Sequence, residues 1–285
     1  WRSAAQWSTL GRPIFEKASR VDAASSVRVH EHSGGWRSLR FLEQGGAENV
    51  QSFHRMVGAN TLDAEALANE YLKAMVSLAF IKRFDAPRVL CLGLGGGSLA
   101  SFFRVRFPES QVVAVELDAA VIEAATSCLG LRSGPTSRTE VHCSDALEWV
   151  QSCAVGMGGD ECFDLIFVDV FDHCNVTPPP FYARGFASDL RLLLAEGGLI
   201  LQNLHTGSRA LDAACVQALA TYSAVFGQGK CCSVPVKLQG NTILAAGREP
   251  LADPSDARED ARENARLAGV RSFDVTARLE RLSVR

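Results

Sequence analysis

Short apolar runs alternate with amphipathic segments over most of the chain. Runs at 88–92, 111–115, 139–143, 163–170, 197–203, 230–236 and 241–246 predict seven strands. Helical spacing fits between most of them, near 98–107, 118–128, 145–152, 181–194 and 207–226. Strands that alternate with helices indicate a mostly parallel sheet covered on both faces, and the last two runs are close enough to pair antiparallel. The pattern predicts an α/β, Rossmann-like domain over residues 63–250.

The flanking segments have other patterns. Residues 1–25 are polar and predict irregular structure, whereas 26–62 predict a small β unit that begins with a hairpin around Ser33-Gly34-Gly35. Residues 63–84 have helical spacing, and Asp85-Ala86-Pro87 ends that helix. Residues 251–285 predict a C-terminal helical extension, in which arginines and acids interleave as on a solvated face.

Composition removes several classes of function. A net charge of -3 over 285 residues gives no general attraction to nucleic acid or anionic membrane. We find no apolar run of the roughly 18 residues that a membrane span needs, and no secretory signal. The nine cysteines include no CxxC pair, so we expect no metal site. Cys91, Cys162 and Cys215 lie in apolar runs and are expected in the core. Thiols in this number indicate a reducing compartment, and we expect a cytoplasmic protein. Because the sequence starts at Trp1 and not at Met, we expect a fragment or processed form, with room for an upstream domain.

A glycine-rich turn follows the 88–92 strand and opens the next helix. Gly93, Leu94, Gly95 and Gly97 form this loop, whose glycines permit a tight turn and the close approach of a ligand to the backbone. Glu116 follows the second strand, 21 residues after Gly95, together with Leu117. An acid at that distance is placed to accept hydrogen bonds from ribose hydroxyls, so the loop predicts a nucleoside-containing cofactor.

The loop and Glu116 alone leave a dinucleotide and S-adenosylmethionine both open. The third glycine of a dinucleotide fingerprint would fall at Ser98, and the first basic residue after the loop is Arg104. Asp145, followed by Ala146, closes the third strand and could accept from an adenine amino group. Asp169 closes the fourth strand at the edge where open α/β sheets bind ligands, and its carboxylate could face a sulfonium or an amine. These positions favour S-adenosylmethionine.

Simpler interpretations compete with each of these assignments. Glu116 and Asp145 could each be ordinary acids at a helix N-terminus, but their joint placement after successive strands favours cofactor binding. His54, His173 and His205 are interpreted as ordinary loop or core histidines. We find no GxSxG motif of a nucleophilic serine.

Together these residues resemble the spermidine synthase-like branch of the class I methyltransferase fold. The resemblance covers about residues 27–248 and implies a seven-stranded sheet with a small N-terminal β unit. It also implies that Gln51, in the Val50-Gln51 pair, contacts the cofactor. The motifs that carry the resemblance are Gly93 to Leu99, Val115-Glu116-Leu117-Asp118, Ser144-Asp145-Ala146 and Phe163 to Asp169.

The chain departs from true aminopropyltransferases at the cofactor loop and at the amine site. Those enzymes carry an acid where this chain has Gly96, and that acid holds the amine end of the decarboxylated cofactor. Its absence removes a negative charge that would repel the carboxylate of intact S-adenosylmethionine. Where those enzymes have the loop that binds the polyamine, this chain has Asp169-Val170-Phe171-Asp172-His173. Where they have a glutamine after the tyrosine, this chain has Leu72 after Tyr71.

Four segments point to one group within that branch, namely Glu70 to Val76, Gly93 to Leu99, Phe107 to Ser110, and Asp169-Val170 with Pro178 to Phe181. They are most similar to the C-terminal domain of methyltransferase-like proteins that methylate elongation factor 1-alpha. The similarity implies methyl transfer from S-adenosylmethionine to a protein amine, the N-terminal α-amine of that factor, with Asp169 or, second to it, Asp172 orienting the amine. A spermidine synthase-like aminopropyltransferase remains the first rival. A non-catalytic scaffold of the same fold is the second, and a dinucleotide oxidoreductase is a distant further one. A homodimer through the β unit is left open.

Overall fold

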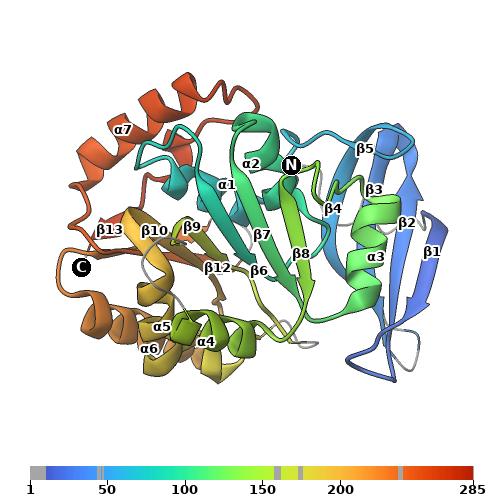
Figure 1. Cartoon of the computed structure of the whole chain (residues 1–285), viewed down its shortest axis with the longest axis horizontal. Helices are drawn as coiled ribbons and strands as arrows, with labels where there is room; N and C mark the ends of the chain where they lie inside the picture. The colour runs from blue at the N-terminus through green and yellow to red at the C-terminus, as the bar shows by residue number, and fades with distance from the viewer. Residues whose placement is uncertain are drawn as a thin grey trace.

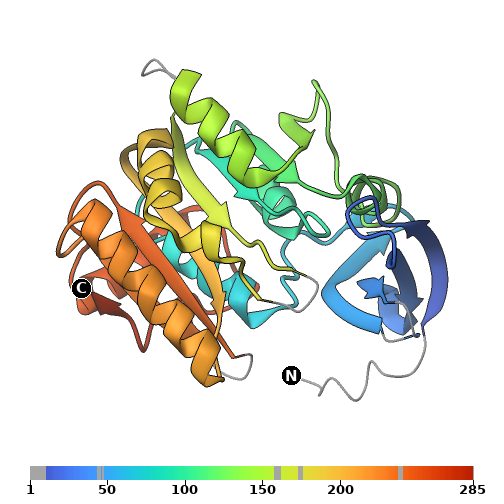
Figure 2. The same cartoon turned by 90° about the horizontal axis from the view of Figure 1, so that it is seen from below.

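Two sheets make up this computed structural model, which describes residues 11–43, 46, 48–156, 162–172, 176–236 and 240–284. The smaller sheet has the order β1-β2-β3-β4-β5 and is antiparallel. The larger has the order β13-β11-β12-β10-β9-β6-β7-β8. In Figures 1 and 2 the small sheet lies beside the β8 end of the large one.

The small-sheet strands are β1 (Arg12–Ala18), β2 (Ser26–His32), β3 (Trp36–Leu42), β4 (Glu48–Gly58) and β5 (Thr61–Leu62). The large-sheet strands are β6 (Arg88–Leu92), β7 (Gln111–Glu116), β8 (Thr139–Cys143), β9 (Phe163–Val168), β10 (Leu194–His205), β11 (Cys231–Val236), β12 (Asn241–Gly247) and β13 (Ser283–Val284).

Both faces of the large sheet are buried, which explains why its strands are apolar throughout. On β9, Leu165 and Phe167 pack into one core and Ile166 and Val168 into the other. Helices cover the two faces in Figure 1, with α1, α2 and α7 on one side and α4, α5 and α6 on the other. The bounds are α1 (Glu70–Ala79), α2 (Ser98–Arg106), α3 (Ala119–Cys128), α4 (Ala146–Gly156), α5 (Arg184–Leu193), α6 (Arg209–Phe226) and α7 (Pro254–Leu267).

Helix α3 joins the two sheets. Val27 and Val29 of β2 share a fully buried cluster with Val121 and Ala124 of α3. Asp118 caps α3 by accepting from the Ala120 amide at 2.8 Å, and its second oxygen accepts from the Ser19 hydroxyl at 2.6 Å. The small sheet is therefore fixed beside β7 and the loop that follows β6.

The seven predicted strands of the α/β domain are confirmed, and β11 and β12 pair antiparallel as expected. An eighth short strand, β13, extends the sheet by pairing with Cys232 and Ser233 of β11. The predicted C-terminal extension is thus helical in α7 but ends in a strand. The predicted 63–84 helix is shorter, because turns precede the N-cap at Asn69 and the helix ends at Ala79.

The prediction of irregular structure over 1–25 was wrong for Arg12–Ala18, which forms β1. This segment pairs along β2, and Ile14 and Phe15 pack against the cluster under α3. Pro13 is tolerated there because β1 is an edge strand. Its polar composition concealed a strand that buries only part of one face. Residues 1–10 lie outside the described part.

Candidate active site

The strand order reverses between β6 and β9, which lie side by side in the large sheet. Such a switch point leaves a crevice at the carboxyl ends of the two strands. A cavity of about 690 Å³ lies there. Its wall contains every residue predicted for the cofactor or the amine except Gly97, namely Gln51, Gly93, Leu94, Gly95, Glu116, Leu117, Asp145, Ala146, Asp169 and Asp172.

The glycine loop forms the floor between β6 and α2. Gly93 has φ +84°, and a Cβ there would lie 2.3 Å from the Asp169 carbonyl oxygen. Gly95 has φ +52° and open space around it. Gly97, with φ +79°, is the N-cap of α2, and a Cβ there would meet Leu131 at 2.9 Å. Gly97 therefore shapes the turn from outside the cavity wall, and Gly93 lets the loop pass close to the end of β9. Gly95 leaves the backbone open to a ligand.

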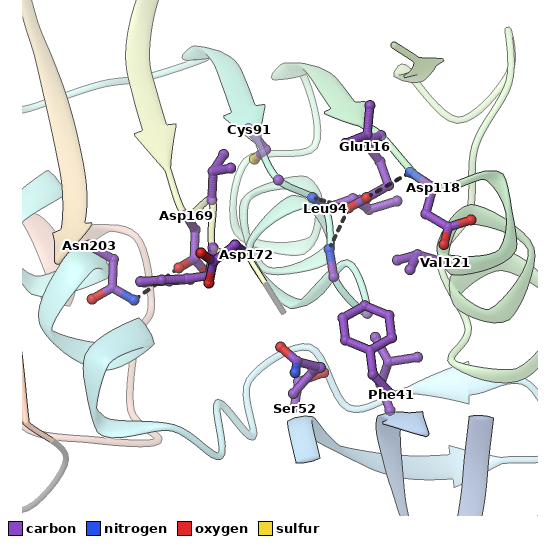
Figure 3. A pocket seen from close by; sticks show the side chains of 18 of the residues that line it. Phe41, Ser52, Cys91, Leu94, Glu116, Asp118, Val121, Asp169, Asp172 and Asn203 are labelled. Carbon is purple, nitrogen blue, oxygen red and sulfur yellow. Dashed lines mark hydrogen bonds between the residues drawn. The ribbon is translucent and has the colours of Figure 1, made fainter. Parts of the chain in front are cut away.

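Glu116 ends β7 opposite this loop, as Figure 3 shows. Its Oε2 accepts from the amides of Leu94 at 3.0 Å and Gly95 at 3.3 Å, and its Oε1 accepts from the Asp118 amide at 3.1 Å. Burial raises the pKa of Glu116, and these backbone hydrogen bonds oppose the rise. The carboxylate is thus held in place by the loop, with acceptor capacity left for hydroxyl groups of a ligand.

The far end of the cavity is formed by Leu117, Asp145, Ala146 and Leu147. One oxygen of Asp145 accepts from the Leu147 amide at 2.7 Å and so caps α4, as the simpler interpretation expected. The Leu117 side chain is about half exposed, at 48%, and lines the cavity. An apolar surface beside a carboxylate suits the flat face and amino group of a purine base.

Asp169 lies at the opposite side, at the carboxyl end of β9 (Figure 3). Its Oδ1 accepts from Asn203 Nδ2 at 2.9 Å, and the Tyr71 hydroxyl also donates to it. Asn203 in turn accepts from Asn241 at 3.0 Å, so a chain of buried polar groups runs into the sheet. Burial raises the pKa of Asp169 to about 6, although the bonds from Asn203 and Tyr71 act the other way. Above that pH the side chain is a fixed, poorly solvated carboxylate, suited to face a cationic centre.

Asp172 differs from Asp169 in its surroundings. It is exposed, and its Oδ1 accepts from the Val176 amide at 2.9 Å within its own loop. Nearby, the Phe171 and His205 rings lie 4.5 Å apart at the cavity wall. Asp172 therefore stabilises the loop after β9, and its assignment to catalysis stays a prediction. His173 lies outside the described residues.

The small sheet closes the cavity from the remaining side. Phe41 and Ser52 point into it from β3 and β4 in Figure 3. Gln51, adjacent to Ser52, also lines it. His54 is buried, with Ser52 Oγ at 2.7 Å from its Nε2 and Ser98 Oγ at 3.2 Å from its Nδ1. The cavity is thus shared by both sheets, so the β unit is part of the site.

Sequence reasoning missed Asn203, Asn241 and the contacts of His54. A signal for Asn203 was present, since Gln202-Asn203 is a polar pair inside the apolar β10 strand. Both side chains are buried and hydrogen-bonded. Asn241 has its partner on β10, and His54 contacts Ser98 on α2 as well as Ser52 on its own strand, so only the folded chain reveals these contacts.

Among the residues that the structure describes, no three His, Cys, Asp or Glu side chains gather to hold a metal ion. The helices of this part of the chain are all too short or too polar to cross a membrane. Of the three predicted core cysteines, Cys91 is buried behind the glycine loop, whereas Cys162 and Cys215 are half-buried.

Curated relatives include methyltransferases and an aminopropyltransferase. The human eEF1A lysine and N-terminal methyltransferase is 32% identical over 50% of this chain and 22% of its own length. The mouse protein of that name is 31% identical over 68% of this chain and 28% of its own. A polyamine aminopropyltransferase of Vibrio vulnificus is 30% identical over 55% of this chain and 50% of its own. The chain thus spans about a quarter of the length of these two methyltransferases and half of the length of the aminopropyltransferase.

Solved structures similar to this chain also include a methyltransferase and a probable spermidine synthase. Human methyltransferase-like protein 13 in complex with SAH superposes with a TM-score of 0.64 at 28% identity, over 71% of this chain and 93% of that one. A probable spermidine synthase from Corynebacterium glutamicum has a TM-score of 0.68 at 20% identity, over 90% and 86% of the two chains, and shows the shared fold. The family model for the spermine/spermidine synthase domain matches residues 69–240, more than half of the chain. The chain therefore belongs to the spermine/spermidine synthase domain family.

Proposed function

We propose that this chain is an S-adenosylmethionine-dependent methyltransferase acting on a protein amine, the N-terminal α-amine of elongation factor 1-alpha. The observation that carries the proposal is the contrast between two positions of one cavity. Asp169 offers a half-buried carboxylate at the switch point, whereas Gly96 leaves the cofactor loop without an acid. The relatives named as eEF1A methyltransferases, and the neighbour bound to SAH, support the choice of cofactor and acceptor.

The described residues fit the proposed cofactor. Gly95 lines the cavity with open space around it, so the backbone of the loop is accessible to a ligand there. Glu116 would accept from ribose hydroxyls and Asp145 from the adenine amino group, while Leu117 and Ala146 would flank the base. Gln51 and the backbone around Gly95 would contact the remaining part of the molecule.

When bound, S-adenosylmethionine supplies a methyl group already activated by its positively charged sulfur, so positioning of the amine does most of the catalytic work. Asp169 would accept an N–H hydrogen bond from the amine and stabilise the positive charge that develops on its nitrogen. Tyr71 and Asn203 hold that carboxylate in one orientation. An unperturbed α-amine has a pKa of about 8 and is partly neutral at pH 7, whereas a lysine amine would need a larger shift. This difference favours an N-terminal acceptor.

The aminopropyltransferase relative makes polyamine synthesis the second candidate. One experiment separates the two activities: the chain is incubated with decarboxylated S-adenosylmethionine and putrescine, and in parallel with S-adenosylmethionine and elongation factor 1-alpha. We expect methylated factor and no spermidine above the enzyme-free blank. Robust spermidine formation without methylated factor would refute the proposal.

Calorimetry with SAH tests the remaining rival. A non-catalytic scaffold that kept only the fold predicts no binding by a chain that circular dichroism shows to be folded. The methyltransferase proposal predicts saturable one-to-one binding. The Glu116→Ala variant is the matched control, because it removes the acceptor opposite the glycine loop.

A further inference from the structure

The imidazole of His54 stands directly over Gly96. A Cβ built on Gly96 would lie 2.1 Å from both Cε1 and Nε2 of that ring, and 2.9 Å from a methyl carbon of Leu129. The leucine methyl could move aside. The ring cannot, because His54 is 1% exposed and lies between two hydroxyl partners. The glycine at position 96 is thus required by a side chain from the other sheet.

The two ring nitrogens of His54 are both engaged. Ser52 Oγ lies 2.7 Å from Nε2, and Ser98 Oγ, in the first turn of α2, lies 3.2 Å from Nδ1. Each hydroxyl can donate or accept, so a ring with one proton satisfies both contacts. Burial lowers the pKa of His54 to about 4, so the ring is uncharged at neutral pH. His54 therefore adds bulk, and no charge, to this wall of the cavity.

The charge at position 96 matters for the choice of cofactor because of the other charged groups that line the cavity. No Lys or Arg is found among the described residues that line the cavity, whereas seven carboxylates line it, those of Asp22, Glu43, Glu116, Asp118, Asp145, Asp169 and Asp172. Only neutral donors and the N-terminus of α2, which carries a partial positive charge, can hold a carboxylate on the loop side. One added acid at position 96 would place a further negative charge beside those donors, which would repel a carboxylate there and favour an ammonium group.

We propose that His54 is a specificity-determining residue, which by occupying the space over Gly96 keeps an acidic side chain out of the cofactor loop and so reserves the site for a cofactor tail that bears a carboxylate. The proposal rests on the proposed function, since it concerns the same cofactor pocket. It assigns to the small sheet a part in choosing between S-adenosylmethionine and its decarboxylated form.

The steric part is tested by a double-mutant cycle in the full chain. Gly96→Ala should lower the melting temperature, because its Cβ meets the His54 ring. His54→Ala combined with Gly96→Ala should recover part of that loss. If Gly96→Ala alone melts like the wild type and binds SAH with unchanged affinity, His54 does not block the position and the proposal fails.

The charge part compares two matched double variants by calorimetry. H54A/G96D and H54A/G96A differ only in a carboxylate, and each is titrated with SAH and with decarboxylated SAH. We expect H54A/G96D to shift the ratio of the two Kd values toward the decarboxylated compound by at least about tenfold relative to H54A/G96A. Equal ratios in the two variants would overturn the proposal. Failure of the wild type to bind either compound would instead refute the proposed function.

Discussion

Replacement of Asp169 by Asn should stabilise the chain while it removes activity. The side chain is half-buried, and the loss of part of its hydration raises its pKa from the ordinary 3.8 to about 6. That difference corresponds to about 3 kcal/mol of destabilisation when the group is ionised in the folded chain. An Asn of the same shape can still accept from Asn203 and can donate to the Tyr71 oxygen, so the network keeps its partners.

The sign of the effect follows from linkage. The pKa of Asp169 is higher in the folded chain than in the unfolded one. Asp169 therefore does not lower the free energy of unfolding below about pH 4, where it is protonated in both states, and lowers it fully above about pH 6, where it is ionised in both. The Asp169→Asn variant should therefore unfold at a higher temperature than wild type at pH 8, by about 5 °C. The gain should shrink between pH 6 and pH 4 and vanish at pH 4.

Differential scanning calorimetry at pH 8, 6 and 4 measures this, with Asp164→Asn as the matched control. Asp164 lies near the other end of β9 and accepts from the Arg88 amide at 2.7 Å. Its replacement should give no stabilisation at pH 8. The reasoning would be refuted by an Asp169→Asn variant that is no more stable than wild type at pH 8. It would also be refuted by a variant whose gain in melting temperature is the same at pH 4 as at pH 8.

Three other changes have defined outcomes. Glu116→Gln replaces a charged acceptor of three amides, so calorimetry should record at least about tenfold weaker SAH binding; unchanged affinity would contradict its assignment. Gly93→Ala should lower the free energy of unfolding, measured by urea titration, by more than about 2 kcal/mol, because the new Cβ would collide with the Asp169 backbone. Gly95→Ala is the control: this position shares the positive φ, but its new Cβ would contact no other atom, so the cost should be only about 1 kcal/mol. Equal costs for the two variants would show that the contact with Asp169 is unimportant. Asp118→Ala removes a helix cap, so it should lower the unfolding free energy by about 1 kcal/mol and speed amide exchange in β1; protection of β1 equal to that of wild type would contradict the role given to this side chain.

The sequence was most informative where chemistry and backbone geometry act locally. Alternation of apolar runs and helices located seven of the eight described strands of the large sheet, because both faces of that sheet are buried, and missed only the short β13. The Gly93 turn and Glu116 were recognisable from spacing, since successive parallel strands end at one edge. The structure brings these two together through hydrogen bonds that the spacing could only suggest.

The parts that the sequence did not reveal depend on contacts between distant segments. Strand β1 is polar and gains its order from pairing with β2 and packing near α3. His54 looked like an ordinary histidine because Gly96 and Ser98, which it contacts in addition to Ser52 of its own strand, lie more than forty residues along the chain. The hydrogen bonds that hold Asp169 likewise come from Tyr71 and Asn203, which lie on two other elements.

The most direct test of the central claim is mass spectrometry of elongation factor 1-alpha after incubation with this chain and S-adenosylmethionine carrying an isotope-labelled methyl group. The account predicts labelled methyl groups on the N-terminal peptide, at the α-amine, with the wild-type chain and none with Asp169→Asn. An N-terminal peptide of unchanged mass after incubation with a folded chain that binds SAH would contradict it.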